Sequence, residues 1–380
     1  MASAWATVDL DAVRANVGRL VELVAPAAVC AVVKADGYGH GAVPVARAAV
    51  DAGATWLAVA HVGEGEALRA GGLDVPVLVL SEPDPDLLPF AAEHELSVTL
   101  FSEPGIRAAA AAARPGRPVR IHLKVDTGMH RVGVDPDDLV PLARLVADTE
   151  GLELEALFTH LAVADEPDDP FTDLQLDRFD AALEDLAAAG IEPRLRHTAN
   201  SAGAIAHPRA RHDLVRCGIA VYGIVPSAEL AGRIRLDPAM TVAARVTQVK
   251  TVAAGETVSY GRRHRLDADT RIATVAVGYA DGVRRDLFRH GGEVLLGGRR
   301  CPIVGTVTMD QLMVDCADVA VAAGDEAVLI GEQCGERIAA EEVAERLGTI
   351  GYEVVCGVGP RVERRWIGGP TPPAPGPLGV

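Results

Sequence analysis

Short apolar runs recur along the first part of the chain and alternate with longer amphipathic stretches. In residues 11–24 the apolar positions follow helical spacing, and Asp9 or Asp11 can cap this helix. The apolar runs that follow lie near residues 27–33, 56–60, 76–80, 97–100, 119–125, 154–159, 195–198 and 214–217. Stretches with helical periodicity separate these runs, for example at residues 41–52, 84–94, 135–149 and 172–189. The pattern predicts strands that alternate with helices.

Eight strand-like runs that alternate with helices are typical of a (β/α)8 barrel. A doubly wound sheet is the alternative, because its strands and helices also alternate. The turn after the first run, residues 35–41, contains Gly-x-Gly-x-Gly and not the dinucleotide-binding fingerprint of such sheets. We therefore predict a TIM-like barrel over residues 1–235.

Beyond residue 235 the apolar residues fall in short alternating segments with frequent glycine, which favours strands. These segments lie at 241–252, 271–277, 293–305, 311–315 and 325–330. One helix is expected near residues 338–347. We predict a mainly β domain over residues 236–367. The Pro- and Gly-rich residues 368–380 cannot build a core, so we expect them to form a disordered tail.

The composition restricts the classes of partner. The net charge of −17 argues against binding to nucleic acid or to an anionic membrane, since both need a basic protein surface. The six cysteines include no C-x-x-C pair, so we expect neither a metal site nor a disulfide framework. The N-terminus does not resemble a signal peptide, and no apolar run approaches the roughly 18 residues of a membrane helix. We therefore expect a cytoplasmic protein.

Lysine is scarce, and the position of one lysine indicates chemistry. Only Lys34, Lys124 and Lys250 are lysines among the 36 basic residues. Lys34 follows the first apolar run, and a lysine, unlike an arginine, can lose its proton and act as an amine nucleophile. The end of a buried strand is where barrel enzymes carry their active sites. A solvent-facing lysine at a strand end is the simpler alternative.

Other polar residues also stand at or just after the ends of the predicted strands. With the first lysine included, they are Lys34, the segment 124–131, His160, the segment 197–201 and Arg216. In a barrel these strand ends meet at one rim, where active sites lie. Strand ends are also polar simply because they meet solvent, so the shared location matters more than any single residue.

Two short segments favour a phosphate site. Asn200-Ser201 and Gly218-Ile219 follow the seventh and eighth predicted strands, where barrels often bind phosphate through backbone N–H groups. A hydroxyl beside such groups suits a phosphate dianion. A plain helix N-cap at Asn200 or Ser201 is an equally good explanation of the first segment.

Residues 32–41, Val-Val-Lys-Ala-Asp-Gly-Tyr-Gly-His-Gly, resemble the cofactor-lysine motif of the bacterial alanine racemases. These are pyridoxal-phosphate (PLP) enzymes with a barrel followed by a β domain. The likeness runs from Val8 to Glu353. Further matching motifs are Lys-Val-Asp-Thr-Gly-Met-His-Arg (124–131), Thr-His-Leu-Ala-Val-Ala-Asp (159–165), His-Thr-Ala-Asn-Ser (197–201), Arg-Cys-Gly-Ile-Ala-Val-Tyr-Gly (216–223), Val-Ser-Tyr-Gly (258–261), Gly-Tyr-Ala-Asp-Gly (278–282) and Met-Asp-Gln (309–311).

The resemblance implies two catalytic residues. Lys34 would hold PLP as an imine and act as one acid/base, and Tyr260 would be the second acid/base on the opposite face of the cofactor. In this family the tyrosine comes from the other subunit, which implies a head-to-tail homodimer with shared active sites. Removal of the Cα proton relies on PLP as an electron sink, and a base on each face allows inversion. The implied reaction is the interconversion of L-alanine and D-alanine.

The resemblance also implies residues around the cofactor and the substrate. Arg216 would face the pyridine nitrogen with His160 beside it. The phosphate end of the cofactor would be held by Tyr38, Asn200, Ser201, Gly218, Ile219 and Tyr352. Arg131 would pair with the carboxylate of a small amino acid near Met309 and Tyr260. Supporting positions would be Tyr279, Asp310 and Lys124, a lysine that is carbamylated in many relatives and braces the substrate-binding arginine.

Some positions leave alternatives open. Thr306, Thr308 and Val283 differ from the commonest family pattern near the substrate end, so a broader, serine-tolerant racemase is one alternative. A non-catalytic PLP-binding barrel protein is another, although such proteins lack the second domain. Related barrel decarboxylases use differently placed acidic groups, and metal-dependent barrel enzymes need a His/Cys ligand pair that is not evident here.

Overall fold

The computed structural model describes residues 3–369, and these divide into two compact units. One unit, called here the barrel unit, contains residues 13–37 and 42–237. The other, the C-terminal unit, contains the remaining described residues, among them the first strand and the segment 38–41. The units therefore do not follow the chain in two successive blocks, unlike the expected division after residue 235.

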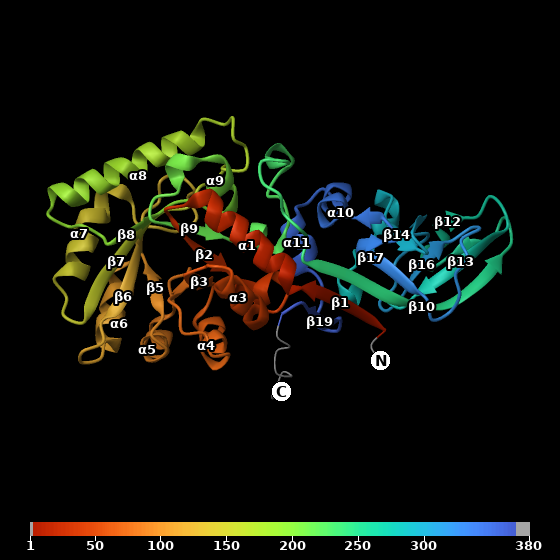
Figure 1. Cartoon of the computed structure of the whole chain (residues 1–380), viewed down its shortest axis with the longest axis horizontal. Helices are drawn as coiled ribbons and strands as arrows, with labels where there is room; N and C mark the ends of the chain where they lie inside the picture. The colour runs from red at the N-terminus through yellow and green to blue at the C-terminus, as the bar shows by residue number, and fades with distance from the viewer. Residues whose placement is uncertain (1–2, 370–380) are drawn as a thin grey trace. The chain divides into compact units, whose positions relative to one another are not determined.

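Eight parallel strands form the sheet of the barrel unit, in the order β8-β7-β6-β5-β4-β3-β2-β9 (Figure 1). They are β2 (Ala28–Val32), β3 (Trp56–Val59), β4 (Val77–Val79), β5 (Ser97–Leu100), β6 (Val119–Lys124), β7 (Leu152–Phe158), β8 (Leu195–His197) and β9 (Leu214–Cys217). The two ends of this order also meet, because the N–H of Asp213 donates to the carbonyl of Arg196 at 3.1 Å. The sheet is a nearly closed barrel, and the predicted fold class is confirmed.

Helices alternate with these strands along the chain. The α-helices are α1 (Leu10–Val24), α2 (Lys34–Tyr38), α3 (Ala42–Asp51), α4 (Val62–Ala70), α5 (Leu88–Glu93), α6 (Glu103–Ala112), α7 (Pro136–Ala147), α8 (Phe171–Ala188) and α9 (Ser201–Ala206). Short 3-10 helices are η1 (Pro85–Leu87), η2 (Pro208–Ala210), η3 (Ile219–Tyr222) and η4 (Ala228–Leu230). Asp9 caps α1, since its carboxylate accepts from the backbone N–H groups of Asp11 (2.9 Å) and Ala12 (3.2 Å).

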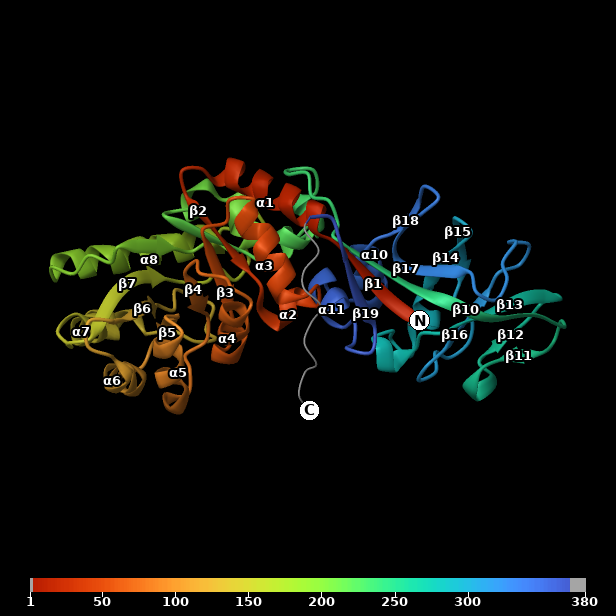
Figure 2. The same ribbon diagram turned by 60° about the horizontal axis from the view of Figure 1, so that its bottom comes forward.

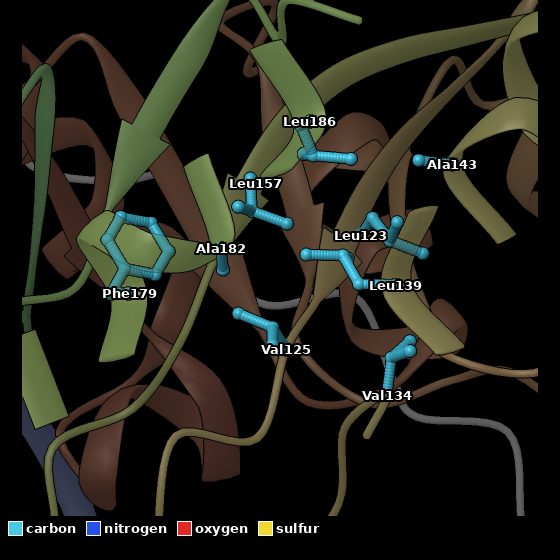
Figure 3. Close-up of a cluster of buried hydrophobic side chains, with 9 residues drawn as sticks. All are labelled: Leu123, Val125, Val134, Leu139, Ala143, Leu157, Phe179, Ala182 and Leu186. Carbon is cyan, nitrogen blue, oxygen red and sulfur yellow. The ribbon is translucent and has the colours of Figure 1, made fainter. Parts of the chain in front are cut away.

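A buried apolar cluster joins β6 and β7 to helices α7 and α8 (Figure 3). Its members are Leu123, Val125, Val134, Leu139, Ala143, Leu157, Phe179, Ala182 and Leu186. Burying a leucine or phenylalanine side chain completely contributes roughly 2 kcal/mol, so this layer is a large part of the local stability. The cluster holds the two strands whose ends carry Lys124 and His160.

The C-terminal unit is built on a nine-stranded sheet, as expected for a mainly β domain. Its central path is β15-β14-β17-β10-β1-β19, while β13 pairs with β10 and β16, and β18 pairs with β17. The strands are β1 (Ala4–Asp9), β10 (Met240–Val252), β13 (Thr270–Val275), β14 (Glu293–Leu296), β15 (Arg299–Pro302), β16 (Leu312–Asp315), β17 (Glu326–Gln333), β18 (Glu336–Ile338) and β19 (Glu363–Ile367).

The smaller elements of this unit include a two-stranded sheet and two short α-helices. They are β11 (Thr257–Val258), β12 (His264–Arg265), α10 (Ala340–Leu347), α11 (Gly351–Cys356) and the 3-10 helices η5 (Tyr260–Arg262), η6 (Tyr279–Asp281) and η7 (Leu287–His290). Helix α10 is the helix expected near residues 338–347. Strands β1, β18 and β19 and helix α11 were not expected from the sequence.

Strand β1 explains why the start of the chain belongs to the C-terminal unit. It pairs antiparallel with β10 and parallel with β19, and both views show it beside β10 (Figures 1 and 2). Segment 38–41 is tied to β19 in the same unit: Trp366 Nε1 donates to the carbonyl of His40 (2.8 Å), and Arg364 Nε donates to that of Gly39 (3.0 Å). These pairings join residues more than 200 positions apart, which local periodicity cannot reveal.

The predicted disordered tail, residues 368–380, lies outside the described residues except for its first two. Within residues 3–369, no helix combines the length and the apolar composition needed to cross a membrane.

Candidate active site

Lys34 stands two residues after the last residue of β2, at the C-terminal end of that barrel strand. The strand end is fixed on both sides. The N–H of Val33 donates to the carbonyl of Ala58 on the neighbouring β3 (2.8 Å), and the buried hydroxyl of Tyr222 donates to the carbonyl of Val32 (2.9 Å). Lys34 is thus half-buried at the predicted rim of the barrel, on a backbone that has little freedom.

The chain makes a left-handed turn immediately after this lysine. Ala35, Asp36 and Gly37 have φ angles of 53°, 50° and 61°, a region that costs an L-residue roughly 1–2 kcal/mol. Glu64, in the first turn of α4, holds the turn: its carboxylate accepts from the N–H groups of Ala35 (2.6 Å) and Ala60 (2.7 Å). Strain that is held in this way is typical of functional sites.

Arg216, at the end of β9, is buried, and within residues 3–369 its hydrogen bonds go to neutral acceptors. Its guanidinium reaches the carbonyls of Thr159 (2.8 Å), Thr198 (3.0 Å) and His197 (3.2 Å). It also reaches the ring nitrogens Nδ1 of His197 (2.7 Å) and of His160 (3.2 Å). Burial lowers the pKa of Arg216 to about 10. The group therefore stays charged at neutral pH without a carboxylate among these acceptors.

Phe158, the last residue of β7, packs against the charged groups of the site. Lys124 Nζ lies 5.5 Å from the centroid of its ring, and the guanidinium carbon of Arg216 lies 5.2 Å from it. The ring of His197 stacks on it at 4.6 Å and 19°. Because the face of an aromatic ring attracts cations, Phe158 helps to keep two positive charges close together in the barrel.

Burial and the positive charges at this end of the barrel lower the pKa values of Lys124 and His160. Burial, followed by the charges of Arg216 and Arg131, lowers the pKa of Lys124 to about 8. Burial and the same cations hold the pKa of His160 well below its ordinary value, with Lys34 contributing to both effects. The structure thus brings these predicted site residues together in one cationic region that is suited to an anion.

Arg131 is exposed and lies in the loop between β6 and α7. Asp126 shapes the start of this loop, since its carboxylate accepts from the N–H of Gly128 at 2.9 Å. The loop returns to the strand end, where the N–H of Val134 donates to the carbonyl of Lys124 at 2.7 Å. Arg131 and Lys124 are therefore carried by one tightly closed loop.

The hydrogen bonds in the first turn of α9 show that the side chain of Asn200 caps this helix. Its oxygen accepts from the N–H of Gly203 at 2.9 Å, so it is the N-cap. The buried hydroxyl of Ser201 accepts from the N–H of Gly218 at 2.9 Å and links the segments after β8 and β9. Ile219 is buried beside them. Contact of these four residues with a phosphate stays a prediction.

In the C-terminal unit, hydrogen bonds connect three segments that carry predicted site residues. The hydroxyl of Ser259 donates to the carbonyl of Thr306 (2.5 Å), and the hydroxyl of Thr306 donates to the carbonyl of Tyr260 (3.0 Å). The N–H of Tyr279 donates to the carbonyl of Thr308 (3.0 Å). The two threonines that depart from the family pattern thus contribute to the backbone framework around both tyrosines.

The side chains on this framework are exposed. Tyr260 is 70% exposed, Met309 52% and Tyr279 41%. Asp310 is also exposed, and its carboxylate accepts from Arg361 at 2.8 Å. Large side chains that remain open on a rigid frame are typical of surfaces that another surface covers.

Tyr38 and Tyr352 lie together in the C-terminal unit, with ring centroids 6.2 Å apart. Tyr38 is buried, and its burial, reinforced by Tyr352, raises the pKa of its phenol above the ordinary value. The phenol of Tyr38 is therefore neutral at neutral pH.

The comparisons with known proteins agree with this geometry. The alanine racemase N-terminal domain family matches residues 8–226, and the alanine racemase C-terminal domain family matches residues 239–366. The chain belongs to the alanine racemase family. Membership confirms the predicted resemblance and the predicted enzyme class, a racemase and thus an isomerase.

Relatives of the alanine racemase family match the chain over nearly its full length. The chain is 50% identical to the alanine racemase of Symbiobacterium thermophilum over 373 residues, which covers 98% of each protein. The solved alanine racemase from D-cycloserine-producing Streptomyces lavendulae is 40% identical, with a TM-score of 0.92 and coverage of 97% and 98%. A solved histidine racemase from Leuconostoc mesenteroides subsp. sake is 30% identical, with a TM-score of 0.89 and coverage of 97% and 98%.

Several residues of this family member were missed by sequence reasoning. Phe158 and Glu64 support the site, and two interior residues, His122 and Glu155, connect to Arg216 through His197. A phenylalanine at a barrel strand end is normally a core residue, which hides its role. Of these residues, Glu155 could have been noticed in the sequence, because it interrupts an apolar run.

Proposed function

We propose that this chain interconverts L-alanine and D-alanine with PLP held at Lys34, and that Tyr260 of the partner subunit supplies the second acid/base. The observation that carries the proposal is the cationic region of the barrel unit, in which burial and the charges of Arg216, Arg131 and Lys34 lower the pKa values of Lys124 and His160. Two anionic groups, a phosphate and an amino-acid carboxylate, would balance this charge.

The residues present fit PLP. Lys34 supplies a primary amine at a rigid strand end, and Ser201 and Gly218 offer a hydroxyl and a backbone turn close to each other. The buried, hydrogen-bonded Arg216 supplies a fixed cation for the ring nitrogen. When bound, PLP supplies an electron sink that stabilises negative charge at Cα. Arg216 keeps its own proton because it is an arginine with five donors and a pKa of about 10.

Lys34 and Tyr260 have complementary tasks in this proposal. One of them takes the proton from Cα on its own face and the other returns a proton on the opposite face, so the two directions of the reaction exchange their roles. His160 holds its proton on Nε2, because its Nδ1 accepts from Arg216. His160 is thus a neutral donor on the cofactor side of the site.

Arg131 is proposed to hold the substrate carboxylate, with Met309 and Tyr279 lining the approach and Asp310 supporting it. The low pKa of Lys124, about 8, raises its fraction of neutral amine. A neutral amine adds CO2 to form a carbamate and releases a proton. The resulting anion would offset the neighbouring cations and brace Arg131, as in the carbamylated relatives.

We propose that the working form is a homodimer. Tyr260 is 70% exposed, and Met309 beside its framework is 52% exposed. An acid/base group that must exclude water cannot work at such exposure. A second copy that covers this surface would bury Tyr260 and place it in the partner's site. The free state of all six cysteines suits a reducing, cytoplasmic location.

Substrate breadth is a second, related question. A histidine racemase shares this fold at 30% identity, so the fold does not restrict the substrate to alanine. Thr306 and Thr308 form backbone contacts beside Tyr260 and Tyr279. Alanine is the proposed main substrate, and L-serine and L-histidine are the competitors to assay.

The deciding experiment is incubation of the PLP-loaded protein with L-alanine in D2O, followed by measurement of D-alanine and of deuterium at Cα. D-alanine that carries deuterium is expected. Deuterium without inversion would leave one working base and contradict the role of Tyr260. Neither signal with any of the three amino acids would favour a PLP-binding protein without racemase activity.

A further inference from the structure

A row of buried, hydrogen-bonded side chains leads from Arg216 into the interior of the barrel. Arg216 Nη1 lies 2.7 Å from Nδ1 of His197, and Nε2 of His197 lies 2.9 Å from Nδ1 of His122. Nε2 of His122 lies 3.1 Å from a carboxylate oxygen of Glu155. None of the four residues is more than 3% exposed. Barrel interiors are normally filled by branched aliphatic side chains, so this row needs an explanation.

A β-bulge directs Glu155 into the barrel. The pairing of β7 with β6 skips Glu155, because its neighbours Leu154 and Ala156 face consecutive residues of β6. As a result, Leu154 and Leu157 both pack on the apolar cluster of Figure 3, although residues three positions apart in a regular strand face opposite sides. Bulges of this kind re-aim a side chain and are common beside active sites.

The two ends of the row allow a single arrangement of protons. An arginine only donates, so Nδ1 of His197 accepts and its proton lies on Nε2. That N–H donates to Nδ1 of His122, which in turn donates from Nε2 to the carboxylate of Glu155. A carboxylate only accepts, so the order cannot be reversed. Burial is the main reason that the pKa values of both histidines are low, which keeps the rings neutral.

Glu155 is itself firmly held and charged. Ser97 donates to it at 2.7 Å, and Arg194 at the barrel surface donates to its other oxygen. Burial opposes its ionisation, but hydrogen bonds from His122 and Ser97 prevail and lower the pKa of Glu155 to about 2. The row therefore connects a buried cation, Arg216, to a buried carboxylate through two neutral rings.

Aromatic packing keeps the two rings in place. Trp56 lies against His122 with ring centroids 5.4 Å apart, and Phe158 stacks on His197 at 4.6 Å. These contacts restrict ring flips, and the complete burial of both rings removes water as an alternative partner. The direction of the row is thus a property of the folded barrel unit alone.

We propose that Glu155 is a positioning residue for Arg216: through His122 and His197 it fixes both imidazole tautomers, and thereby the place and charge of the guanidinium. The catalytic consequence rests on the proposed role of Arg216 beside the cofactor ring. The hydrogen-bonded row does not depend on that role, so the row and its catalytic consequence are tested separately.

The row is tested by NMR of cofactor-free protein labelled with [15N]histidine at pH 7, with signals assigned from His122→Gln and His197→Gln variants. In the wild type, both rings are expected to carry the proton on Nε2 only. E155Q keeps an oxygen acceptor, so both rings should keep the proton on Nε2. E155L removes the acceptor, so His122 should no longer show a single tautomer. Rings protonated on Nδ1 in the wild type, or unchanged signals in E155L, would overturn the proposal.

The catalytic consequence is tested on the PLP-loaded enzyme. We expect E155L to lower kcat about tenfold with KM for alanine unchanged, and E155Q to recover most of the loss. S97A is the matched control, because it removes a hydrogen bond from Glu155 without touching the imidazoles. It should lower the melting temperature but leave kcat and the histidine signals unchanged.

The outcomes separate the two questions. Wild-type kcat in E155L with disturbed histidine signals would overturn the positioning role and leave the racemase proposal intact. A wild type that does not racemise would refute the proposed function, while the spectra would still decide the row. Should E155L not fold, E155D serves in its place, since the shorter side chain breaks the 3.1 Å contact and retains the carboxylate.

Discussion

In the barrel unit, the predicted site residues Arg216 and Lys124 are buried beside the ring of Phe158. In the C-terminal unit, by contrast, Tyr260 and Met309 stand exposed on a hydrogen-bonded backbone. Arg216 and Lys124 are 3% and 5% exposed, and Tyr260 and Met309 are 70% and 52% exposed. Burial in a medium of low dielectric constant changes the pKa values of the first pair strongly. The barrel unit therefore sets its electrostatics alone, while the C-terminal unit offers groups that need a covering surface.

The strongest test of this contrast is a pair of inactivating substitutions. Lys34→Ala and Tyr260→Phe each remove one acid/base and should lower kcat by roughly 10²–10⁴-fold, with Lys34→Ala at the upper end because it also removes the attachment of PLP. The measurement is D-alanine formation by each purified variant. Near-normal activity of Tyr260→Phe would contradict its role as a base.

Co-expression of the same two variants tests whether the sites are shared. Random pairing makes half of the dimers mixed, and a mixed dimer has one intact site of two if Tyr260 acts in the partner's site. About one quarter of wild-type activity should return. No recovery in verified mixed dimers would mean that Lys34 and Tyr260 act within one chain.

Gly278→Ala tests whether the backbone around Tyr279 in the C-terminal unit is rigid. A Cβ at this position would lie 2.3 Å from the carbonyl oxygens of Thr308 and Met309, and those atoms belong to backbone that cannot give way easily. We expect a loss of about 1–3 kcal/mol in the free energy of unfolding and a raised KM for alanine. Denaturant unfolding and initial-rate kinetics measure the two effects. A wild-type free energy of unfolding together with a wild-type KM would show that this backbone adjusts easily.

The pH dependence of the free energy of unfolding tests the effect of burial on the charges of the barrel unit. The pKa of Lys124 is about 8 in the folded protein and ordinarily 10.5, so between these values the unfolded chain binds more protons than the folded one. The free energy of unfolding should rise from pH 8 to 10, by up to about 1.4 kcal/mol per pH unit. Lys124→Met should remove this contribution in CO2-free buffer, and equal slopes would contradict it. With 13CO2 supplied to the wild type, a carbamate carbon signal is expected.

The smallest effect is expected at Gly18 in α1, where a Cβ would meet nothing within 4 Å. Gly18→Ala should raise the free energy of unfolding by about 0.5–1 kcal/mol, because alanine loses less backbone entropy in a helix. The melting temperature and kcat are the measurements, and kcat should not change. A destabilised Gly18→Ala would show that open space around a glycine is a poor guide in this fold.

Sequence reasoning was most successful where the pattern is local. All eight barrel strands and the capping of α1 by one of two aspartates followed from periodicity over a few residues. It failed for β1 and β19, which pair with each other across the length of the chain. Apolar alternation in such short strands is too weak to be distinguished from loops. The motifs of the family gave the predicted site residues, but no motif indicated which of them are buried.

The amino-acid sequence by itself determined the order of strands and helices, the placement of Lys34 at a strand end and the family of the chain. Only the tertiary structure decided that Glu155 faces the barrel interior, that His197 and His122 form one hydrogen-bonded row with it and that Tyr260 is exposed. Periodicity and motifs are properties of neighbouring residues. Burial, hydrogen-bond partners and the pKa values that depend on them are set by residues from strands far apart in the chain, and these meet only when the barrel closes.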